Sequence, residues 1–226
     1  SSVTRNGDSM QISGQIRASA GTVARIRLRW QLARFMAATE DCRATQAQTL
    51  ASLLELNGQS DLAIQNGLGN ASTPEDLDKA ISVTDYSFYR DAIERAKRGE
   101  TQALLGPKNR LVMFTLSSGT TSDSKFIPVT NRFYRDYRRS WQLWGISAFD
   151  ARPKMKALKI VQLSSDYQRF TTEGGTPCGN ISGLAAAMQK PIVKLLYTLP
   201  AILAKIDNAE NKYYTALRLA VADPNV

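Results

Sequence analysis

The chain has 226 residues, of which 43% are hydrophobic and 22% charged, and its formal net charge is +9. This size and balance suit a globular protein of one large domain or two small ones and give no reason to expect extended disorder. Because the sequence contains no histidine, Ser-His-Asp catalysis, Cys-His catalysis and the usual histidine-containing zinc sites are excluded.

The two cysteines and the lack of long apolar stretches bear on location. Cys42 and Cys178 lie far apart and fit neither a disulfide framework nor a metal-site spacing, which favours a reducing compartment such as the cytoplasm. No stretch approaches the roughly 20 apolar residues of a transmembrane helix, and the first ten residues lack the apolar core of a signal peptide. We therefore expect a cytoplasmic protein without a membrane span; the sequence leaves its oligomeric state open.

The first half of the chain is predicted to be helical. Residues 1–21 are expected to form a flexible lead-in, and residues 22–226 a single domain. Apolar residues recur at helical spacing over 22–38; part of this stretch also alternates as a strand would, but its length favours a helix. A second helix is predicted over 44–56, and Asn57-Gly58 would end it in the left-handed conformation.

Two shorter helices are marked by their starts. Thr73-Pro74-Glu75-Asp76 combines an N-cap residue, a proline in the first turn and two acids near the positive end of the helix dipole. Thr84 is expected to cap the next helix, which ends at Gly99.

From residue 111 onwards the pattern indicates strands alternating with helices. The apolar run 111–116 predicts a strand buried on both faces. A second strand is predicted over 125–129, where Pro128 indicates an edge or irregular position. The remaining expected elements are a helix capped by Thr130 and reaching about 148, a strand over 155–163, a glycine-rich loop over 173–183, a helix between Pro191 and Pro200, and a helix over 207–221. The order predicts an α/β fold in which helices pack around a mixed sheet.

The segment between the first two predicted strands concentrates groups that bind phosphate. It reads Ser117-Ser118-Gly119-Thr120-Thr121-Ser122-Asp123-Ser124-Lys125. Gly119 lets the backbone turn and approach a ligand closely. Successive backbone N–H groups in such a turn can point at one anion, the hydroxyls add further donors, and Lys125 adds a positive charge. The alternative interpretation is a Ser/Thr-rich surface turn between two strands.

A P-loop of the Walker type fits this segment poorly. Gly119 to Lys125 nearly satisfies G-x-x-x-x-G-K-[ST]. However, Ser124 stands where the second glycine belongs, and Phe126 replaces the hydroxyl that would bind magnesium. A strand rather than a helix is also predicted to follow. A P-loop NTPase is therefore disfavoured.

At these residues the sequence resembles the adenylate-forming enzymes, and its flanks narrow the resemblance to the auxin-responsive acyl-acid amido synthetase family. The residues that carry it are Phe114 to Thr121, Lys125 to Thr130, Thr84-Asp85-Tyr86 through Arg98-Gly99-Glu100, Gly174 to Gly179, and Lys212-Tyr213-Tyr214. The resemblance covers roughly Ala44 to Val226 and implies the N-terminal part of an adenylate-forming domain.

The resemblance implies an ATP-dependent ligase. With ATP and Mg²⁺, a small carboxylic acid would become an acyl-adenylate, and the amine of an amino acid would then attack the acyl carbon and release AMP. Ser117, Ser118, Gly119, Thr120 and Thr121 would hold the phosphates, and Lys125 matches the catalytic lysine of the family, although its spacing from the loop varies there. Fixed donors around the departing pyrophosphate would lower the barrier.

The helix expected after Thr130 carries an aromatic stripe, Phe133, Tyr137, Trp141 and Trp144. The resemblance implies that it lines the acyl-acid pocket, with Tyr137 and Trp141 touching the substrate. Stripes of this kind more often belong to a hydrophobic core, so packing is the favoured interpretation of the pattern itself.

Adenylate-forming enzymes of this kind are more than twice as long as this chain. We expect the residues that hold adenine, ribose and Mg²⁺ to lie beyond Val226, and therefore expect the chain alone not to adenylate an acid. The competing hypothesis is a basic, non-enzymatic module that binds nucleic acid or an acidic surface. Its support is two arginine groups, at 25, 27, 29 and 34 and at 132, 135, 138 and 139. No nucleic-acid-binding motif accompanies them, so nucleic acid is a disfavoured partner, and two solvated helix faces would explain the same charges.

Overall fold

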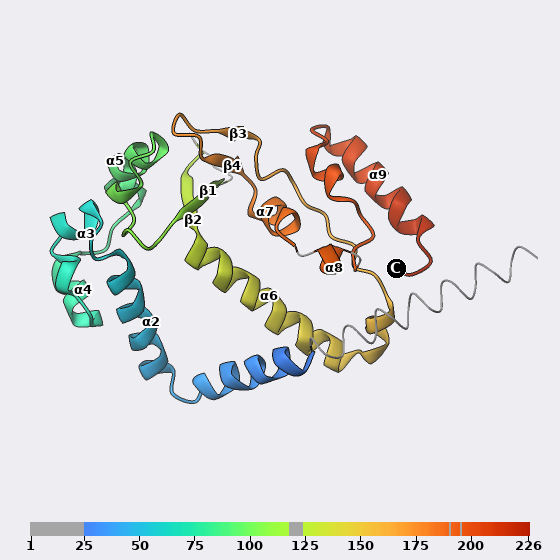
Figure 1. The fold of residues 1–226 in the computed structure, drawn as a ribbon, viewed down its shortest axis with the longest axis horizontal. Coiled ribbons are helices and arrows are strands. Elements are labelled where there is room, and N and C mark those ends of the chain that lie inside the picture. Colours follow the sequence, from blue (N-terminus) through green and yellow to red (C-terminus); the bar gives the residue numbers. More distant parts are fainter. Residues whose placement is uncertain (1–24, 118–123, 190, 195) are drawn as a thin grey trace, which may run out of the picture. The chain divides into compact units, whose positions relative to one another are not determined.

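The computed structural model describes residues 25–117, 124–189, 191–194 and 196–226 (Figure 1). The expected lead-in over 1–21 lies outside these residues. The chain divides into two compact units: one contains residues up to Phe35 together with Arg138–Asp166 and Ser182–Val226, and the other contains Met36–Tyr137 and Tyr167–Ile181.

The second unit contains the sheet. Its strands are β1 (Leu111–Leu116), β2 (Phe126–Thr130), β3 (Phe170–Thr171) and β4 (Pro177–Gly179), in the order β2-β1-β4-β3. β1 pairs antiparallel with β2 and parallel with β4, and β3 pairs antiparallel with β4. The mixed sheet with packed helices confirms the predicted fold class, and β1 has the predicted bounds.

The core of this unit lies between the sheet and one helix. Met113 and Phe114 are both fully buried, and because successive side chains of a strand point to opposite faces, the middle of β1 is covered on both sides, as predicted. Helix α5 (Tyr86–Lys97) contributes Ile93 and Ala96 to a buried cluster with Phe114 and Cys178. These contacts fix α5 against β1, the strand that leads into the expected phosphate loop.

β2 is an edge strand, which confirms the interpretation of Pro128. It is hydrogen-bonded only to β1 within the described sheet, and Pro128 is paired with Phe114 in the register. Proline has no N–H to donate and is tolerated where that N–H would face away from the ladder. The edge position is therefore what allows a proline in the middle of β2.

Residues 173–183 are not only a loop, and this part of the prediction is wrong. The stretch contains β4 and the start of α7 (Ile181–Ala187). The glycines do form a turn, since Gly175 has a φ of +80°, and Gly174 donates its N–H to the Lys97 carbonyl at 2.8 Å. The sequence hides β4 because the strand has three residues and depends on a partner far along the chain.

The helices before the sheet largely follow the prediction. α2 (Cys42–Asn57) is capped by Asp41, whose side chain accepts a hydrogen bond from the Ala44 N–H. α4 (Pro74–Ala80) begins with a capping box between Thr73 and Asp76. The short α3 (Asp61–Gln65) and the 3-10 helices η1 (Leu68–Asn70) and η2 (Thr101–Ala103) complete this part of the chain.

The conformation of one predicted helix cap and the identity of another are wrong, although α2 ends where predicted. Gly58 has a φ of −59° and is therefore not in the left-handed conformation. A Cβ at this position would lie 2.9 Å from the Leu54 carbonyl oxygen. The close approach of the Leu54 backbone, and not the φ angle, therefore explains why a glycine is needed. Thr84 does not cap α5, because its hydroxyl bonds the Tyr89 hydroxyl at 2.9 Å. Asp85 is the cap and accepts a hydrogen bond from the Ser87 N–H at 2.8 Å.

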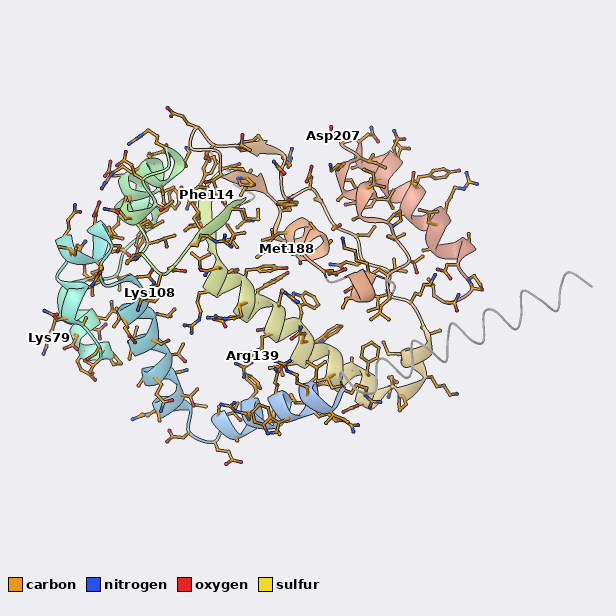
Figure 2. The ribbon with its side chains drawn as sticks, viewed as in Figure 1. Lys79, Lys108, Phe114, Arg139, Met188 and Asp207 are labelled. Carbon is orange, nitrogen blue, oxygen red and sulfur yellow. The ribbon has the colours of Figure 1, made fainter. Side chains whose placement is uncertain are left out.

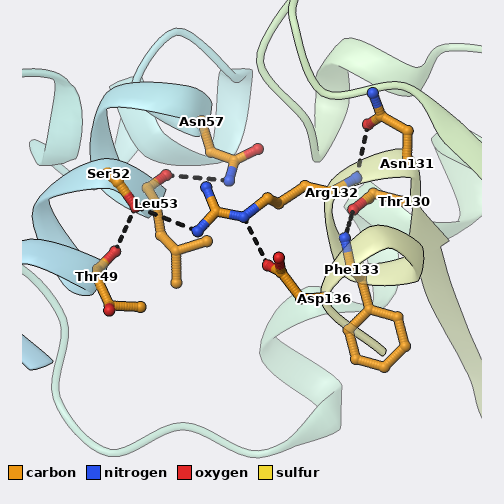
Figure 3. A network of polar contacts seen from close by, with 9 residues as sticks. All are labelled: Thr49, Ser52, Leu53, Asn57, Thr130, Asn131, Arg132, Phe133 and Asp136. Carbon is orange, nitrogen blue, oxygen red and sulfur yellow. Dashed lines mark hydrogen bonds and ion pairs between the residues drawn. The ribbon is translucent and has the colours of Figure 1, made fainter. Parts of the chain in front are cut away.

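A polar network fixes the start of α6 (Asn131–Ala151) within the second unit (Figure 3). The Thr130 hydroxyl accepts a hydrogen bond from the Phe133 N–H at 3.1 Å, which confirms it as the cap. The Arg132 guanidinium donates to Asp136 at 2.7 Å and to the Ser52 hydroxyl of α2 at 3.4 Å. The contact between Arg132 and Ser52 of α2 therefore helps to set the direction in which α6 leaves β2.

The first unit begins with the predicted helix, which runs over 25–38 in the described residues. Arg25 and Arg29 both pair with Asp150 near the end of α6, the latter at 2.8 Å. The guanidinium of Arg34 lies 4.8 Å from the centroid of the Trp30 ring. Most of this arginine group is thus engaged within the unit.

The strand expected over 155–163 is wrong. Residues Pro153–Ala157 form the 3-10 helix η3, since a proline suits the first position of a helical turn. Ile160 forms a single parallel bridge with Tyr197. The rest of the unit consists of α7, α8 (Pro191–Lys194), the 3-10 helix η4 (Ala201–Lys205) and α9 (Ala209–Ala222).

Candidate functional site

The two ends of the expected phosphate loop meet beside the sheet. The Ser117 N–H donates to the Lys125 carbonyl oxygen at 3.1 Å. The Lys125 N–H donates to the Ser117 hydroxyl at 3.3 Å. Both residues follow or precede a strand of the β1–β2 hairpin, so the ladder that positions the strands also holds the ends of the loop together.

The rest of the loop is not described. Ser118, Gly119, Thr120 and Thr121 all lie in the gap between 117 and 124, so their role in binding phosphate stays a prediction. Of the proposed nucleotide-binding residues the structure therefore places Ser117 and Lys125, and it brings those two together.

Lys125 lies beside the first turn of α5. Its ammonium nitrogen is 5.5 Å from the centroid of the Tyr86 ring, within the range of a cation–π contact. The Tyr86 hydroxyl accepts a hydrogen bond from the Phe126 N–H at 3.0 Å. Tyr86 therefore contacts both the side chain that ends the loop and the backbone of the next residue.

Asp85 adds a carboxylate to this neighbourhood. The pKa of Asp85 is lowered, chiefly because it accepts hydrogen bonds from the hydroxyl and N–H of Ser87, and to a smaller degree because of the positive charge of Lys125. An ionised Asp85 near Lys125 reduces the net positive charge that an anion would meet, and it caps α5 at the same time.

The ring of Phe126 lies on the core side of β2 and joins the strand to α5. Its ring centroid is 5.9 Å from that of Phe114, edge to face, and the Lys97 ammonium lies 4.2 Å from it. Phe114 is labelled on β1 in Figure 2. Phe126, the residue after the loop, thus contacts both ends of α5, through Tyr86 and through Lys97.

Sequence reasoning missed the contribution of Tyr86. Thr84-Asp85-Tyr86 stood out as part of the family resemblance, but the pattern alone gave it no role. The contact between Tyr86 and Phe126 joins residues 40 positions apart, so no local periodicity signals it.

The aromatic stripe of α6 is not core, which corrects the favoured interpretation of that pattern. Phe133, Trp141 and Trp144 are 50%, 55% and 65% exposed. The buried residues of the helix are instead Tyr134, Leu143 and Ile146. Phe133 stacks on Tyr137 with ring centroids 6.2 Å apart, so part of the stripe is ordered by contacts between its own members.

The described residues contain neither a cluster of metal-binding side chains nor a helix that could span a membrane. In the described ranges, no cluster of three or more carboxylate or thiolate side chains is arranged to hold a metal ion. None of the helices in that part of the chain combines the length and the hydrophobicity needed to cross a bilayer. Both cysteines are free thiols.

Comparison with known proteins places the chain in a family. A model described as the GH3 family N-terminal domain matches residues 31–226. A similar curated protein is the jasmonoyl–L-amino acid synthetase JAR6 of Nicotiana attenuata, 27% identical over 147 residues; the match covers 62% of this chain and 24% of that protein.

Solved structures show the same fold. A GH3.15 acyl acid amido synthetase superposes with a TM-score of 0.71 at 17% identity, covering 84% of this chain and 33% of that one. A structure of AtGH3.15 in complex with 2,4-DB gives a TM-score of 0.54 at 17% identity, covering 61% and 24% of the two chains. The chain thus spans about a quarter to a third of the length of the proteins it resembles. Since the family model matches most of its residues, the chain belongs to the GH3 family.

Proposed function

We propose that this chain forms the phosphate-binding part of an ATP-dependent acyl-acid amido synthetase. The observation that supports this most is the hydrogen-bonded pairing of the loop ends, Ser117 and Lys125, at the base of a hairpin. The residues between them, 118–124, are rich in hydroxyl groups. Family membership supplies the reaction class, because the relatives it resembles are named as amido synthetases.

In the proposed reaction, an acid carboxylate oxygen attacks the α-phosphorus of ATP and pyrophosphate leaves. Negative charge grows on the leaving group, so donors fixed beforehand at its oxygens lower the barrier. Ser117 and the hydroxyls of Ser118, Thr120 and Thr121 would donate to the phosphates, Gly119 would let the backbone approach, and Lys125 would offset charge on the departing group. The described residues contain no cluster of three or more carboxylate or thiolate side chains that could hold a metal ion; a bound Mg²⁺ would neutralise part of the charge of the phosphates.

The substrates proposed are a small carboxylic acid and an amino acid. One relative is named for joining jasmonate to amino acids, and a solved relative holds 2,4-DB. On α6, the half-exposed ring of Trp141 and the ring of Tyr137 are proposed to contact the apolar part of the acid. The free thiols suit a reducing compartment, and we propose the cytoplasm.

A nucleotide series tests the phosphate-binding role. Binding of ATP, ADP, AMP and adenosine to the chain, measured by equilibrium dialysis with Mg²⁺ present, should strengthen with each added phosphate. Each charge-assisted contact to the loop and Lys125 is worth about 1.5–3 kcal/mol, so ATP should bind at least about tenfold more tightly than AMP. Equal affinity across the series would contradict the proposal.

We propose that catalytic turnover requires the longer chain of the family members. With the chain alone, pyrophosphate exchange over a panel of acids should stay at background, because the chain covers about a quarter to a third of its relatives. Clear exchange would show that these residues suffice for adenylation.

A further inference from the structure

We propose that Tyr86 is a positioning residue for the phosphate loop: it fixes the loop's C-terminal end by binding the Phe126 backbone with its hydroxyl and the Lys125 ammonium with its ring. The inference rests on the proposed function, because it concerns how the same loop meets the phosphates. Tyr86 itself need not touch the nucleotide.

The backbone contact arises from the edge position of β2. In an antiparallel pair, N–H groups point alternately toward the partner strand and away from it. Lys125 exchanges its hydrogen bonds with Ser117 on the inner side, so the N–H of Phe126 points outward. The Tyr86 hydroxyl accepts that N–H at 3.0 Å. Without Tyr86, an outer-edge donor directly after the loop would have only water as a partner.

The second contact holds the positive charge of Lys125 in place. The Lys125 ammonium lies 5.5 Å from the centroid of the same ring, which draws the cation toward the ring face. One side chain therefore holds two consecutive residues, one through its backbone and the other through its ammonium group. Together these contacts limit where Lys125 can place its charge relative to Ser117.

Tyr86 can act as a fixed point because α5 is fixed. Ile93 and Ala96 of that helix are 3% and 0% exposed against the sheet. Asp85 caps the helix directly before Tyr86, and a satisfied cap resists fraying of the first turn. Tyr86 thus links the end of the loop to the core of the unit and fixes the position of that end.

Two substitutions separate the contacts, and a third serves as the control. Tyr86→Phe removes the hydroxyl and keeps the ring, whereas Tyr86→Leu removes both contacts. Tyr89→Phe is the matched control, because Tyr89 lies on the same helix and its hydroxyl bonds Thr84 and not the loop. All are made in the whole chain and compared by amide hydrogen exchange without nucleotide and by equilibrium dialysis with Mg-ATP and AMP.

In Tyr86→Phe, the Phe126 amide should exchange about fivefold faster, the change expected for losing one ordinary hydrogen bond. ATP should bind about fivefold more weakly and AMP less than twofold more weakly. Tyr86→Leu should weaken ATP binding further, and Tyr89→Phe should change neither affinity. A loss that depends on the number of phosphates is not expected from a residue that only stabilises the fold.

The outcomes that overturn the inference differ from those that overturn the proposed function. If the unaltered chain shows no preference for ATP, the proposed function fails, and this inference fails with it. If the unaltered chain prefers ATP and Tyr86→Phe binds it equally well, the positioning role alone is wrong. Equal weakening for ATP and AMP, or an unchanged exchange rate at Phe126, would likewise overturn the positioning role.

Discussion

Asp150 is the internal partner of two arginines whose partner the sequence does not reveal. Two arginines of the 25–38 helix pair with it, and hydrogen bonds first from Arg29 and then from Arg25 lower its pKa to about 2. The sequence shows the arginines as a group facing an unknown anion. The structure supplies an internal partner, which periodicity could not reveal because Asp150 lies 121 positions from Arg29.

We predict that Asp150→Asn loosens the 25–38 helix, with faster amide exchange in that segment at neutral pH. The control is Asp207→Asn, because Asp207 is an exposed carboxylate shortly before α9 (Figure 2) and forms no ion pair among the described residues. Equal exchange of the helix in both variants would show that the arginine pairs contribute nothing there.

The same carboxylate predicts a pH dependence. A folded-state pKa of about 2, below the ordinary value of 3.8, means that the ionised form stabilises the fold above about pH 4. This contribution is lost as pH falls toward 2. The difference in thermal midpoint between the unaltered chain and Asp150→Asn should therefore be largest at neutral pH and shrink steadily as pH falls from about 4 to about 2. A difference of the same size at pH 2 and at pH 7 would contradict the assignment.

At the scale of elements, the 173–175 turn approaches the end of α5 so closely that only a glycine fits at position 174. A Cβ on Gly174 would lie 2.5 Å from the Gly99 nitrogen and 2.7 Å from the Arg98 carbonyl carbon. Both are backbone atoms and cannot rotate away. The turn leads directly into β4, so this contact helps to seat the central part of the sheet.

We predict that Gly174→Ala destabilises the chain by about 1–3 kcal/mol, since overpacking against backbone forces a shift. Gly145→Ala is the matched control: Gly145 lies within α6 with open space around it, so alanine should stabilise by about 0.5–1 kcal/mol. Urea denaturation measures both changes. Equal stability of the two variants would show that the turn adapts freely.

Helices were the more predictable elements because their signals are local. Thr73 with Asp76, and Thr130 before α6, mark helix starts within four residues of sequence. Strand β4 pairs with β1 across a long stretch of chain, and Ile160 makes only one bridge. The sequence therefore did not predict β4, which lies in a glycine-rich segment. It also predicted a strand over the apolar run 155–163, where the described residues form none.

At the scale of the whole molecule, the net charge of +9 does not by itself indicate a nucleic-acid partner. Arg25, Arg29 and Arg132 are paired with carboxylates within the chain, and Arg34 lies over Trp30. The two strands that flank the loop were predictable from the sequence, whereas the contacts of Tyr86 with Lys125 and Phe126 depend on the tertiary fold.

We predict that a labelled 30-base RNA binds the chain only weakly at about 150 mM salt, measured by fluorescence anisotropy. Because no nucleic-acid-binding motif gathers the basic residues, few of them should contact phosphates at once, and the slope of log affinity against log salt should be shallow, about −2 to −3. Tight binding with a steep slope would favour the basic-module hypothesis over the ligase.

The central claim is that residues 117–125 bind the phosphates of a nucleotide, and an amide NMR titration with Mg-ATP tests it most directly. We predict that the largest shifts fall on these residues, that Lys125→Ala weakens binding about tenfold, and that Lys108→Ala, at the opposite end of β1, leaves it unchanged. Shifts located elsewhere in the chain, or equal affinity of Lys125→Ala and Lys108→Ala, would contradict the claim.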